Sequence, residues 1–166
     1  MRPSGQKKST IIKDIAYDKK AGKLYGISMN KMFEIDMATG AQTALYSGFY
    51  FGVTGMMLYT MASDDAGTIY AISSLGALCS LDQTTGCGEY VIDKNTKLDG
   101  TSLNGSNNSM AFGSDGTLYW AATTTAKGTA STVLNKVDLA TGKVSQYIGS
   151  FGGEDRDVKL TGMYIK

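Results

Sequence analysis

The side chains that most often carry catalysis are scarce in this sequence. Histidine is absent, which removes the commonest general base and metal ligand and excludes nucleophile systems of the Ser-His type. Two cysteines, Cys79 and Cys87, do not complete a zinc site. A carboxylate pair for glycoside cleavage would have to come from Glu34, Glu89 or Glu154 together with aspartates. The sequence therefore predicts a chain that is not an enzyme and that binds no metal and no cofactor.

Aromatic, amide and charged side chains in expected loops are better candidates for binding. A run of three aromatics could form a contact patch, asparagine amides could bind hydroxyl groups, and a charged loop could contact a polar ligand. The expected ligand-binding residues are Phe49, Tyr50, Phe51, Asn104, Asn107, Asn108, Arg156 and Asp157. Each group also has a structural interpretation: core packing for the aromatics, turn formation for the asparagines and a solvated loop for the charges.

An Asp-x-x-Thr-Gly signature occurs at residues 36–40, 82–86 and 138–142. An aspartate at the start of a turn accepts backbone N–H groups, and glycine adopts the positive φ that other residues resist. Calcium needs about six to eight oxygen ligands, whereas each turn supplies one carboxylate. We therefore expect three hairpin turns and no metal site. Cys79 and Cys87 flank the second turn with their thiols on opposite faces, so both are expected to be free.

These turns belong to a longer repeat. Each copy contains an alanine-centred run, a Leu/Ile-Tyr run, a run that ends in the turn aspartate, and a run after the turn glycine. The alanines are Ala16, Ala62 and Ala111, so the period is 46 (62 − 16) and then 49 (111 − 62) residues. This period matches one blade of a β-propeller. The runs are short, rich in β-branched and aromatic residues, and bounded by glycine and aspartate, as strands are.

We predict an all-β fold of three four-stranded antiparallel β-propeller blades plus one extra strand, as a partial propeller or half of a ring. The expected ranges are a polar N-terminal extension at 1–10 and repeats at 11–166, with blade 1 over about 11–48, blade 2 over about 53–92, blade 3 over about 107–148 and the extra strand over 158–165. Propellers close with about four to eight blades. The chain is therefore a piece of a longer propeller, half of a homodimeric six-bladed ring, or an open arc that relies on partners.

The longer connections are expected on one face of the propeller, at residues 47–54, 93–108, 122–131 and 149–157. Long loops gathered on one face suggest the binding face. The recurring Tyr25, Tyr70 and Tyr119 are predicted to pack between blades, although rings at one repeated position could also stack on sugars or bases.

Charge and hydropathy narrow the range of binding partners that the sequence predicts. The 16 basic and 15 acidic residues leave a net charge of +1, and no basic stripe predicts nucleic-acid binding. No apolar run approaches the roughly 18 residues that span a membrane. The polar start of the chain contains no signal peptide, so the compartment remains unknown from the residues alone.

The phrase Leu-Tyr-Gly-Ile-Ser at 24–28, followed by Met-Phe-Glu-Ile-Asp-Met-Ala-Thr-Gly-Ala-Gln-Thr at 32–43, resembles bacterial propellers with YVTN-like or quinoprotein-like repeats. It is also similar to secreted and surface propellers of gut bacteria. The resemblance covers residues 11–165 and implies ligand or protein binding at the ring face, often outside the cytoplasm. Quinoprotein blades carry a docking tryptophan in each repeat, whereas Trp120 is the only tryptophan here, so the resemblance does not extend to quinone binding.

Two function hypotheses follow. The first is a non-catalytic β-propeller module for binding or scaffolding, which recognises a protein or a glycan through its long-loop face. The alternative is a fragment of a propeller enzyme, of the lyase or lactonase type, with a metal site in the central channel. A stoichiometric divalent ion in the purified protein would favour the alternative.

Overall fold

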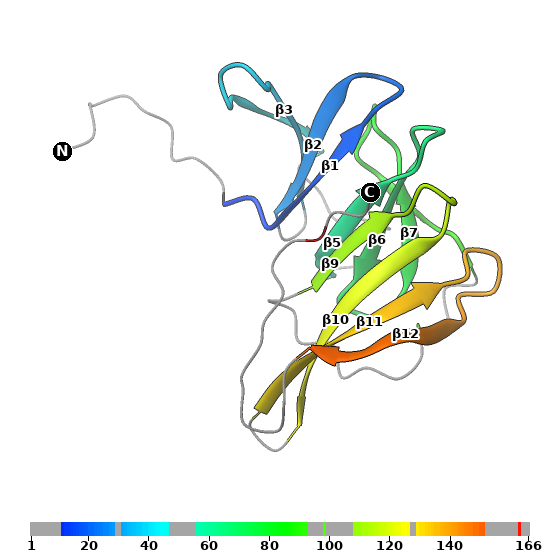
Figure 1. The fold of residues 1–166 in the computed structure, drawn as a ribbon. Coiled ribbons are helices and arrows are strands. Elements are labelled where there is room, and N and C mark those ends of the chain that lie inside the picture. Colours follow the sequence, from blue (N-terminus) through cyan, green and yellow to red (C-terminus); the bar gives the residue numbers. More distant parts are fainter. Residues whose placement is uncertain are drawn as a thin grey trace.

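The computed structural model describes residues 11–28, 31–46, 56–92, 98, 108–126, 129–151 and 163. These residues form twelve strands and contain no helix. The strands make three four-stranded sheets, and each strand pairs antiparallel with its neighbour along the chain. The fold is therefore all-β, with three propeller-type blades (Figure 1). No helix long and apolar enough to cross a membrane occurs in the described part of the chain.

Each blade is one continuous stretch of sequence. Blade 1 consists of β1 (Asp14–Asp18), β2 (Lys23–Ser28), β3 (Lys31–Ile35) and β4 (Gln42–Tyr46). Blade 2 consists of β5 (Leu58–Ser63), β6 (Ile69–Ser73), β7 (Leu78–Leu81) and β8 (Gly88–Tyr90). Blade 3 consists of β9 (Asn108–Phe112), β10 (Leu118–Ala126), β11 (Thr129–Val137) and β12 (Val144–Phe151). The extension at 1–10 lies outside the described residues, as does the expected extra strand apart from Met163.

The register of the sheets confirms the repeat. The alanine of the first strand faces the tyrosine of the second strand in every blade. These pairs are Ala16 with Tyr25, Ala62 with Tyr70, and Ala111 with Tyr119. Directly opposite residues point to the same face of a sheet, so each pair marks the face that its blade turns toward the next blade.

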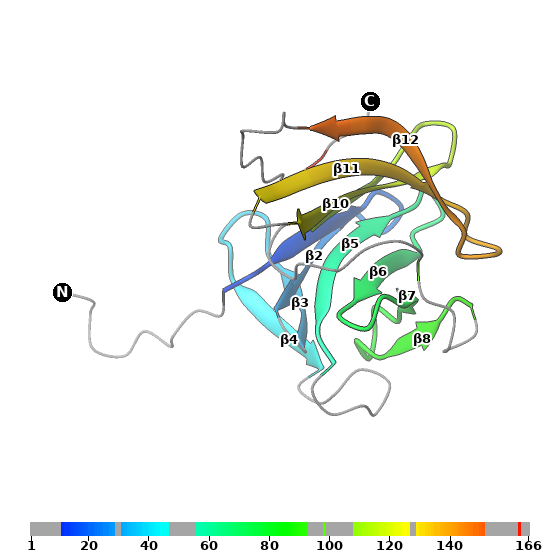
Figure 2. The ribbon, with the colours of Figure 1, turned by 90° about the horizontal axis from the view of Figure 1, so that it is seen from below.

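Apolar side chains fill the two junctions between blades. Between blades 1 and 2 the buried cluster consists of Ala16, Tyr25, Ile27, Met32, Leu58, Met61, Ile69, Ala71 and Leu81. Between blades 2 and 3 it consists of Ala62, Ile72, Leu78, Leu98, Met110, Leu118, Trp120, Ala122 and Val137, with Tyr70 and Phe112 among the half-buried members. The structure thus confirms the packing role of Tyr25 and Tyr70. Figure 2 shows the three sheets arranged side by side around the inner strands.

The prediction of an irregular loop over 122–131 is wrong. Strands β10 and β11 continue through most of this segment, and Thr123 lies opposite Thr132. Both side chains are fully buried, and their hydroxyl oxygens lie 2.9 Å apart in a hydrogen bond. The reason is that β-branched residues favour strands, and a polar hairpin can bury its threonines when they bond to each other. Strand β12 likewise extends to Phe151, into the segment expected as a loop over 149–157.

The three Asp-x-x-Thr-Gly segments are hairpin turns, as predicted. In the first, Asp36 Oδ1 accepts hydrogen bonds from the backbone N of Ala38 at 3.0 Å and of Thr39 at 2.7 Å. The same bonds recur in the other two turns. The closing glycines have φ values of 70°, 68° and 68°. Hydrogen bonds from the turn lower the pKa of the three aspartates below the ordinary value.

Both cysteines are free, as predicted from the register. Cys79 faces Tyr90 across β7 and β8, and the backbone N of Asp82 donates to the carbonyl of Cys87 at 2.8 Å. The Cys79 thiol is fully buried, and this burial raises its pKa to about 12. Cys87 is exposed at the turn.

Candidate functional site

Of the residues that the sequence suggested for ligand binding, the structure describes Asn108. The other seven lie outside the described residues: Phe49, Tyr50, Phe51, Asn104, Asn107, Arg156 and Asp157. Asn108 begins β9 and is 7% exposed. Its Oδ1 accepts a hydrogen bond from the Trp120 indole Nε1 at 3.2 Å. Because a buried indole N–H needs an acceptor, Asn108 supports the packing of blade 3 in this structure.

A hollow surface lies where the first strands of the three blades, β1, β5 and β9, run side by side (Figure 1). We call it the inner groove. It lies at the end of these strands that leads into the first turn of each blade, and its volume is about 320 Å³. The side chains that give it chemical character are Tyr17, Lys19, Ser63, Asp65, Phe112 and Ser114. In a closed propeller the sheets surround a central channel, so the inner groove belongs to the channel side of this arc.

Two aromatic rings border the inner groove. Tyr17 is 47% exposed. Phe112 is half-buried, because its ring packs against Tyr70 with the centroids 5.4 Å apart at an interplanar angle of 55°. The Phe112 ring is therefore held in place, whereas Tyr17 presents its face or edge to solvent. Rings in this situation can stack against a sugar ring, a planar group or an apolar side chain of a ligand.

Polar groups of opposite charge lie beside the rings. Lys19 Nζ of blade 1 lies 3.1 Å from Asp65 Oδ1 of blade 2. Both side chains are largely exposed, so the pair adds little stability and can open at little cost. The Ser63 hydroxyl donates to the Asp64 carbonyl at 3.2 Å, and Ser114 adds a second hydroxyl. Within the described residues, no three His, Cys, Asp or Glu side chains gather where they could hold a metal.

Sequence reasoning did not assemble this site, although the repeat contains a signal for it. Tyr17, Ser63 and Phe112 each follow the recurring alanine of their blade, so they hold one position in three copies. Their neighbours Lys19, Asp65 and Ser114 are likewise equivalent. An alignment of the copies by structural position therefore brings together residues that are far apart along the chain.

A polar joint below the inner groove fixes blade 1 against blade 2. Asp18 is 3% exposed, and its Oδ1 accepts the backbone N of Lys20 and Ala21 at 2.9 and 3.0 Å. Its Oδ2 accepts the Gln83 amide of blade 2 at 3.4 Å, and the same amide donates to the Gly67 carbonyl. Gly67 has a φ of +86°, and a Cβ there would lie 3.0 Å from Asp18 Oδ1. Glycine is therefore required at this contact.

Asp14 makes a second polar joint between these blades. Its Oδ2 accepts hydrogen bonds from the Thr60 hydroxyl at 2.5 Å and from the backbone N of Met61 at 2.9 Å. Burial raises the pKa of the Asp14 carboxyl, and these hydrogen bonds oppose the shift. A carboxylate that is partly withdrawn from water thus holds the first strand of blade 1 against that of blade 2.

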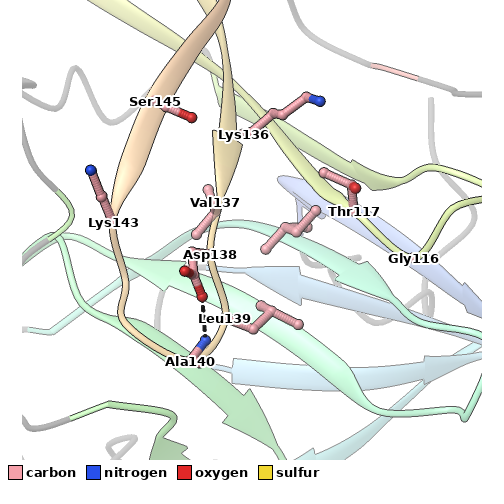
Figure 3. A pocket seen from close by; sticks show the side chains of 10 residues that line it. Gly116, Thr117, Lys136, Val137, Asp138, Leu139, Ala140, Lys143 and Ser145 are labelled. Carbon is pink, nitrogen blue, oxygen red and sulfur yellow. Dashed lines mark hydrogen bonds between the residues drawn. The ribbon is translucent and has the colours of Figure 1, made fainter.

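A second kind of groove lies beside the hairpin turns. In blade 3 it has a volume of about 610 Å³ and is bordered by Thr117, Lys136, Lys143 and Ser145 (Figure 3). Blade 2 has the equivalent groove, of about 430 Å³. In blade 1 an ion pair lies in the corresponding place, with Lys23 Nζ 2.9 Å from Glu34 Oε2. Glu34 was one of the glutamates that the sequence offered for a pair of catalytic carboxylates.

Because the turn-side groove recurs with the repeat and changes its charge from blade to blade, we attribute it to the geometry of a blade. The aspartate at its edge is engaged within its own turn, as the bond from the Ala140 backbone N to Asp138 Oδ1 shows (2.8 Å; Figure 3). The inner groove, in contrast, combines side chains from three blades and is the better candidate site.

No protein-family model matches the chain, and no curated protein is significantly similar to it. Solved structures share its fold. A protein of unknown function from Bacteroides thetaiotaomicron aligns with a TM-score of 0.58 at 15% identity, over 82% of this chain and 33% of its own. The hemopexin-fold protein CP4 from cow pea aligns with a TM-score of 0.53 at 12% identity, over 93% of this chain and 77% of its own.

A PQQ-bound aldose sugar dehydrogenase from Streptomyces coelicolor aligns with a TM-score of 0.50 at 19% identity, over 78% of this chain and 45% of its own. At such identities the likeness shows the fold alone. The fold is that of a partial β-propeller, as predicted. The chain spans about a third of the length of the Bacteroides protein.

Proposed function

We propose that this chain is a non-catalytic binding part of a β-propeller and that it recognises a segment of a protein or a glycan. The observation that carries the proposal is the inner groove, which brings a half-exposed tyrosine, two serine hydroxyls and an openable Lys–Asp pair into one hollow. Its volume of about 320 Å³ is at the lower end of ligand sites, which run from about 300 to 1,000 Å³.

The chemistry of the inner groove suits a ligand with both apolar and polar surface. Tyr17 offers a ring for stacking, and Ser63 and Ser114 offer hydroxyls for hydrogen bonds. Lys19 and Asp65 can exchange their exposed ion pair for bonds to a charged or hydroxyl-rich ligand. The absence of histidine from the sequence supports binding without catalysis.

Part of the proposal concerns residues outside the described structure. The long-loop face, with Phe49, Tyr50 and Phe51 as its aromatic patch, is proposed as a further contact region. A location outside the cytoplasm is proposed as well, because the repeat resembles secreted and surface propellers of gut bacteria. Fractionation of the native cells tests the location: recovery of the protein only in the cytoplasmic fraction would contradict it.

The binding proposal can be tested by NMR, because the chain has a mass of only 17.6 kDa. We would titrate ¹⁵N-labelled protein with soluble cello-, malto- and chito-oligosaccharides and with a mixed peptide library. Saturable shifts are expected at the amides of Tyr17, Ser63 and Phe112. Removal of a stacking ring costs about 1–3 kcal/mol, so Tyr17→Ala should weaken binding about fivefold or more.

The control variant is Leu75→Ala, which removes an exposed apolar side chain of blade 2 that does not line the groove. It is expected to bind as the wild type does. Binding that Tyr17→Ala leaves unchanged, or no binding to any of these probes, would count against the inner groove as the site.

A further inference from the structure

Blade 1 carries most of the large apolar side chains that are exposed in the described residues. The large apolar side chains that are exposed in the described residues are Ile11 (83%), Ile15 (53%), Tyr17 (47%), Met37 (61%) and Leu75 (50%). All but Leu75 belong to blade 1 or to the residues that lead into it. Single exposed apolar residues are common, whereas a group on one element marks an interaction surface.

The repeat shows what these positions do in another blade. Ile15 and Met37 are equivalent to residues of blade 3 that lie in the junction with blade 2. Those equivalents are Met110 and Leu139. Both belong to the apolar cluster between blades 2 and 3, and Met110 is only 4% exposed. The outer face of blade 1 is therefore one half of a blade–blade junction.

Side chains of blade 1 itself fill the centre of this outer face. Gly26 holds the position of Ala71 in blade 2 and Trp120 in blade 3. A Cβ on Gly26 would lie 2.8 Å from Ile35 Cδ1 and 3.0 Å from Ile12 Cγ2, so these two side chains cover the glycine. Ile15 and Met37 remain outside this contact. The face is thus a preformed apolar surface and does not need to unfold to receive a partner.

The complementary half is present in the same chain. On blade 2, the residues that receive blade 3 are Tyr70, Ile72 and Leu78. Their equivalents on blade 3 are Tyr119, Ala121 and Leu134, which form a cluster of their own with Met163 packed against it. One chain therefore carries both surfaces of the junction that it builds twice internally, one at each end of the arc.

We propose that the outer face of blade 1 docks on the outer face of blade 3 of a second copy, and that two copies close a six-bladed ring. A head-to-tail contact of this kind forms a ring when the rotation closes. Closed propellers have about four to eight blades, and each copy contributes three. Six is the multiple of three within that range, so a ring of identical copies contains two chains.

Charge at the first turns agrees with this arrangement. Inside the chain, Lys19 of blade 1 pairs with Asp65 in the turn of the following blade. At the junction between copies, the equivalent positions are Ser114 of blade 3 and Lys19 of blade 1. A neutral hydroxyl therefore faces the lysine, so no like charges oppose each other at the rim of the apolar contact. The Met163 contact would give way to Ile15 of the second copy.

The test is the mass in solution, measured by sedimentation velocity over a wide range of protein concentrations. The wild type is expected to pass from 17.6 kDa to about 35 kDa, twice the chain mass. Ile15→Glu and Met37→Glu place a charge in the contact and are expected to raise the dimer dissociation constant at least about tenfold. Leu75→Glu is the matched control, because Leu75 is equally exposed but lies on blade 2, and it should dimerise normally.

Three results would overturn the proposal. The wild type could remain a monomer at all concentrations, which would show that the face does not bind a second copy. The dimer could survive both Ile15→Glu and Met37→Glu, or Leu75→Glu could disrupt it equally. All three substitutions replace exposed side chains, so circular dichroism should show a folded protein in each case. None of them changes a residue named above as a ligand contact, so this test is independent of the binding test.

Discussion

Asp36, Asp82 and Asp138 show how one residue type shapes this protein. Each carboxylate accepts backbone N–H groups of the turn that follows, and each turn ends in a glycine with positive φ. These bonds stabilise the charged form of the carboxyl and lower its pKa. The turns could be predicted from the sequence because all their partners lie within four residues of one another.

The lowered pKa of these aspartates predicts how stability depends on pH. A group whose pKa is lower in the folded state stabilises the fold above its unfolded pKa, and the contribution disappears as pH falls through the folded value. The fold should therefore lose stability as pH drops below the ordinary aspartate pKa of 3.8. In the Asp36→Asn, Asp82→Asn, Asp138→Asn triple variant, which cannot titrate there, the loss should be smaller.

Urea unfolding at a series of pH values between neutral and strongly acidic conditions measures this difference. The wild type and the triple variant should diverge in slope only on the acidic side. Parallel curves for the two proteins would show that the turn carboxylates do not contribute to acid unfolding.

Between elements, the first strands of blades 1 and 2 depend on Asp14. The carboxylate accepts the Thr60 hydroxyl and the Met61 backbone N, and Thr60 is fully buried. Burial raises the pKa of this group, in the opposite direction to the turn aspartates. Asp14 therefore costs some stability in its charged form, and that cost is relieved as pH falls through its folded pKa.

From the hydrogen bonds of Asp14 we expect two substitutions at this position to change the stability differently. Asp14→Ala leaves the Thr60 hydroxyl and the Met61 N–H without their acceptor, which should cost about 1–3 kcal/mol in the free energy of unfolding. Asp14→Asn keeps an oxygen acceptor and removes the buried charge, so its stability at neutral pH should stay close to that of the wild type. Urea unfolding compares the three proteins, and faster hydrogen exchange at the Met61 amide in Asp14→Ala would locate the effect. An equal loss in both variants would mean that the charge itself holds the joint.

The limits of sequence reasoning are also clearest between elements. The period and the turn signatures predicted twelve short strands in their blades, because strand patterns and turns are local. The hairpin of β10 and β11 was missed, since only the pairing of Thr123 with Thr132 makes a threonine-rich segment a buried strand. The inner groove was missed for a similar reason: Tyr17 and Phe112 come together only when the blades pack.

At the scale of the whole molecule, each blade is stabilised by its neighbours. In the described structure blade 2 packs on both faces and Met163 packs on the outer face of blade 3, whereas blade 1 has a partner on one face. In such arrays, stability is roughly a sum of terms from each unit and each junction. Blade 1 is therefore expected to open before the rest of the chain unfolds.

The chain contains two natural probes for this opening, one on each side of blade 2. Cys79 lies on the same face of blade 2 as Ala71 and Met61, the face that packs on blade 1, in a buried cluster with Met56 and Ala77. Trp120, the only tryptophan, lies in the junction with blade 3. Because burial raises the pKa of the Cys79 thiol to about 12, the native protein should not react there until an opening exposes it.

In a Cys87→Ser variant, which removes the exposed thiol, labelling of Cys79 in native conditions should give a smaller opening free energy than unfolding followed by Trp120 fluorescence. The smaller value means that the junction of blades 1 and 2 opens while that of blades 2 and 3 remains closed. Asp14→Ala should widen the gap between the two values, because it weakens only the first junction. Equal values from both probes would instead show that the three blades unfold as one cooperative unit, with the junctions as strong as the blades themselves.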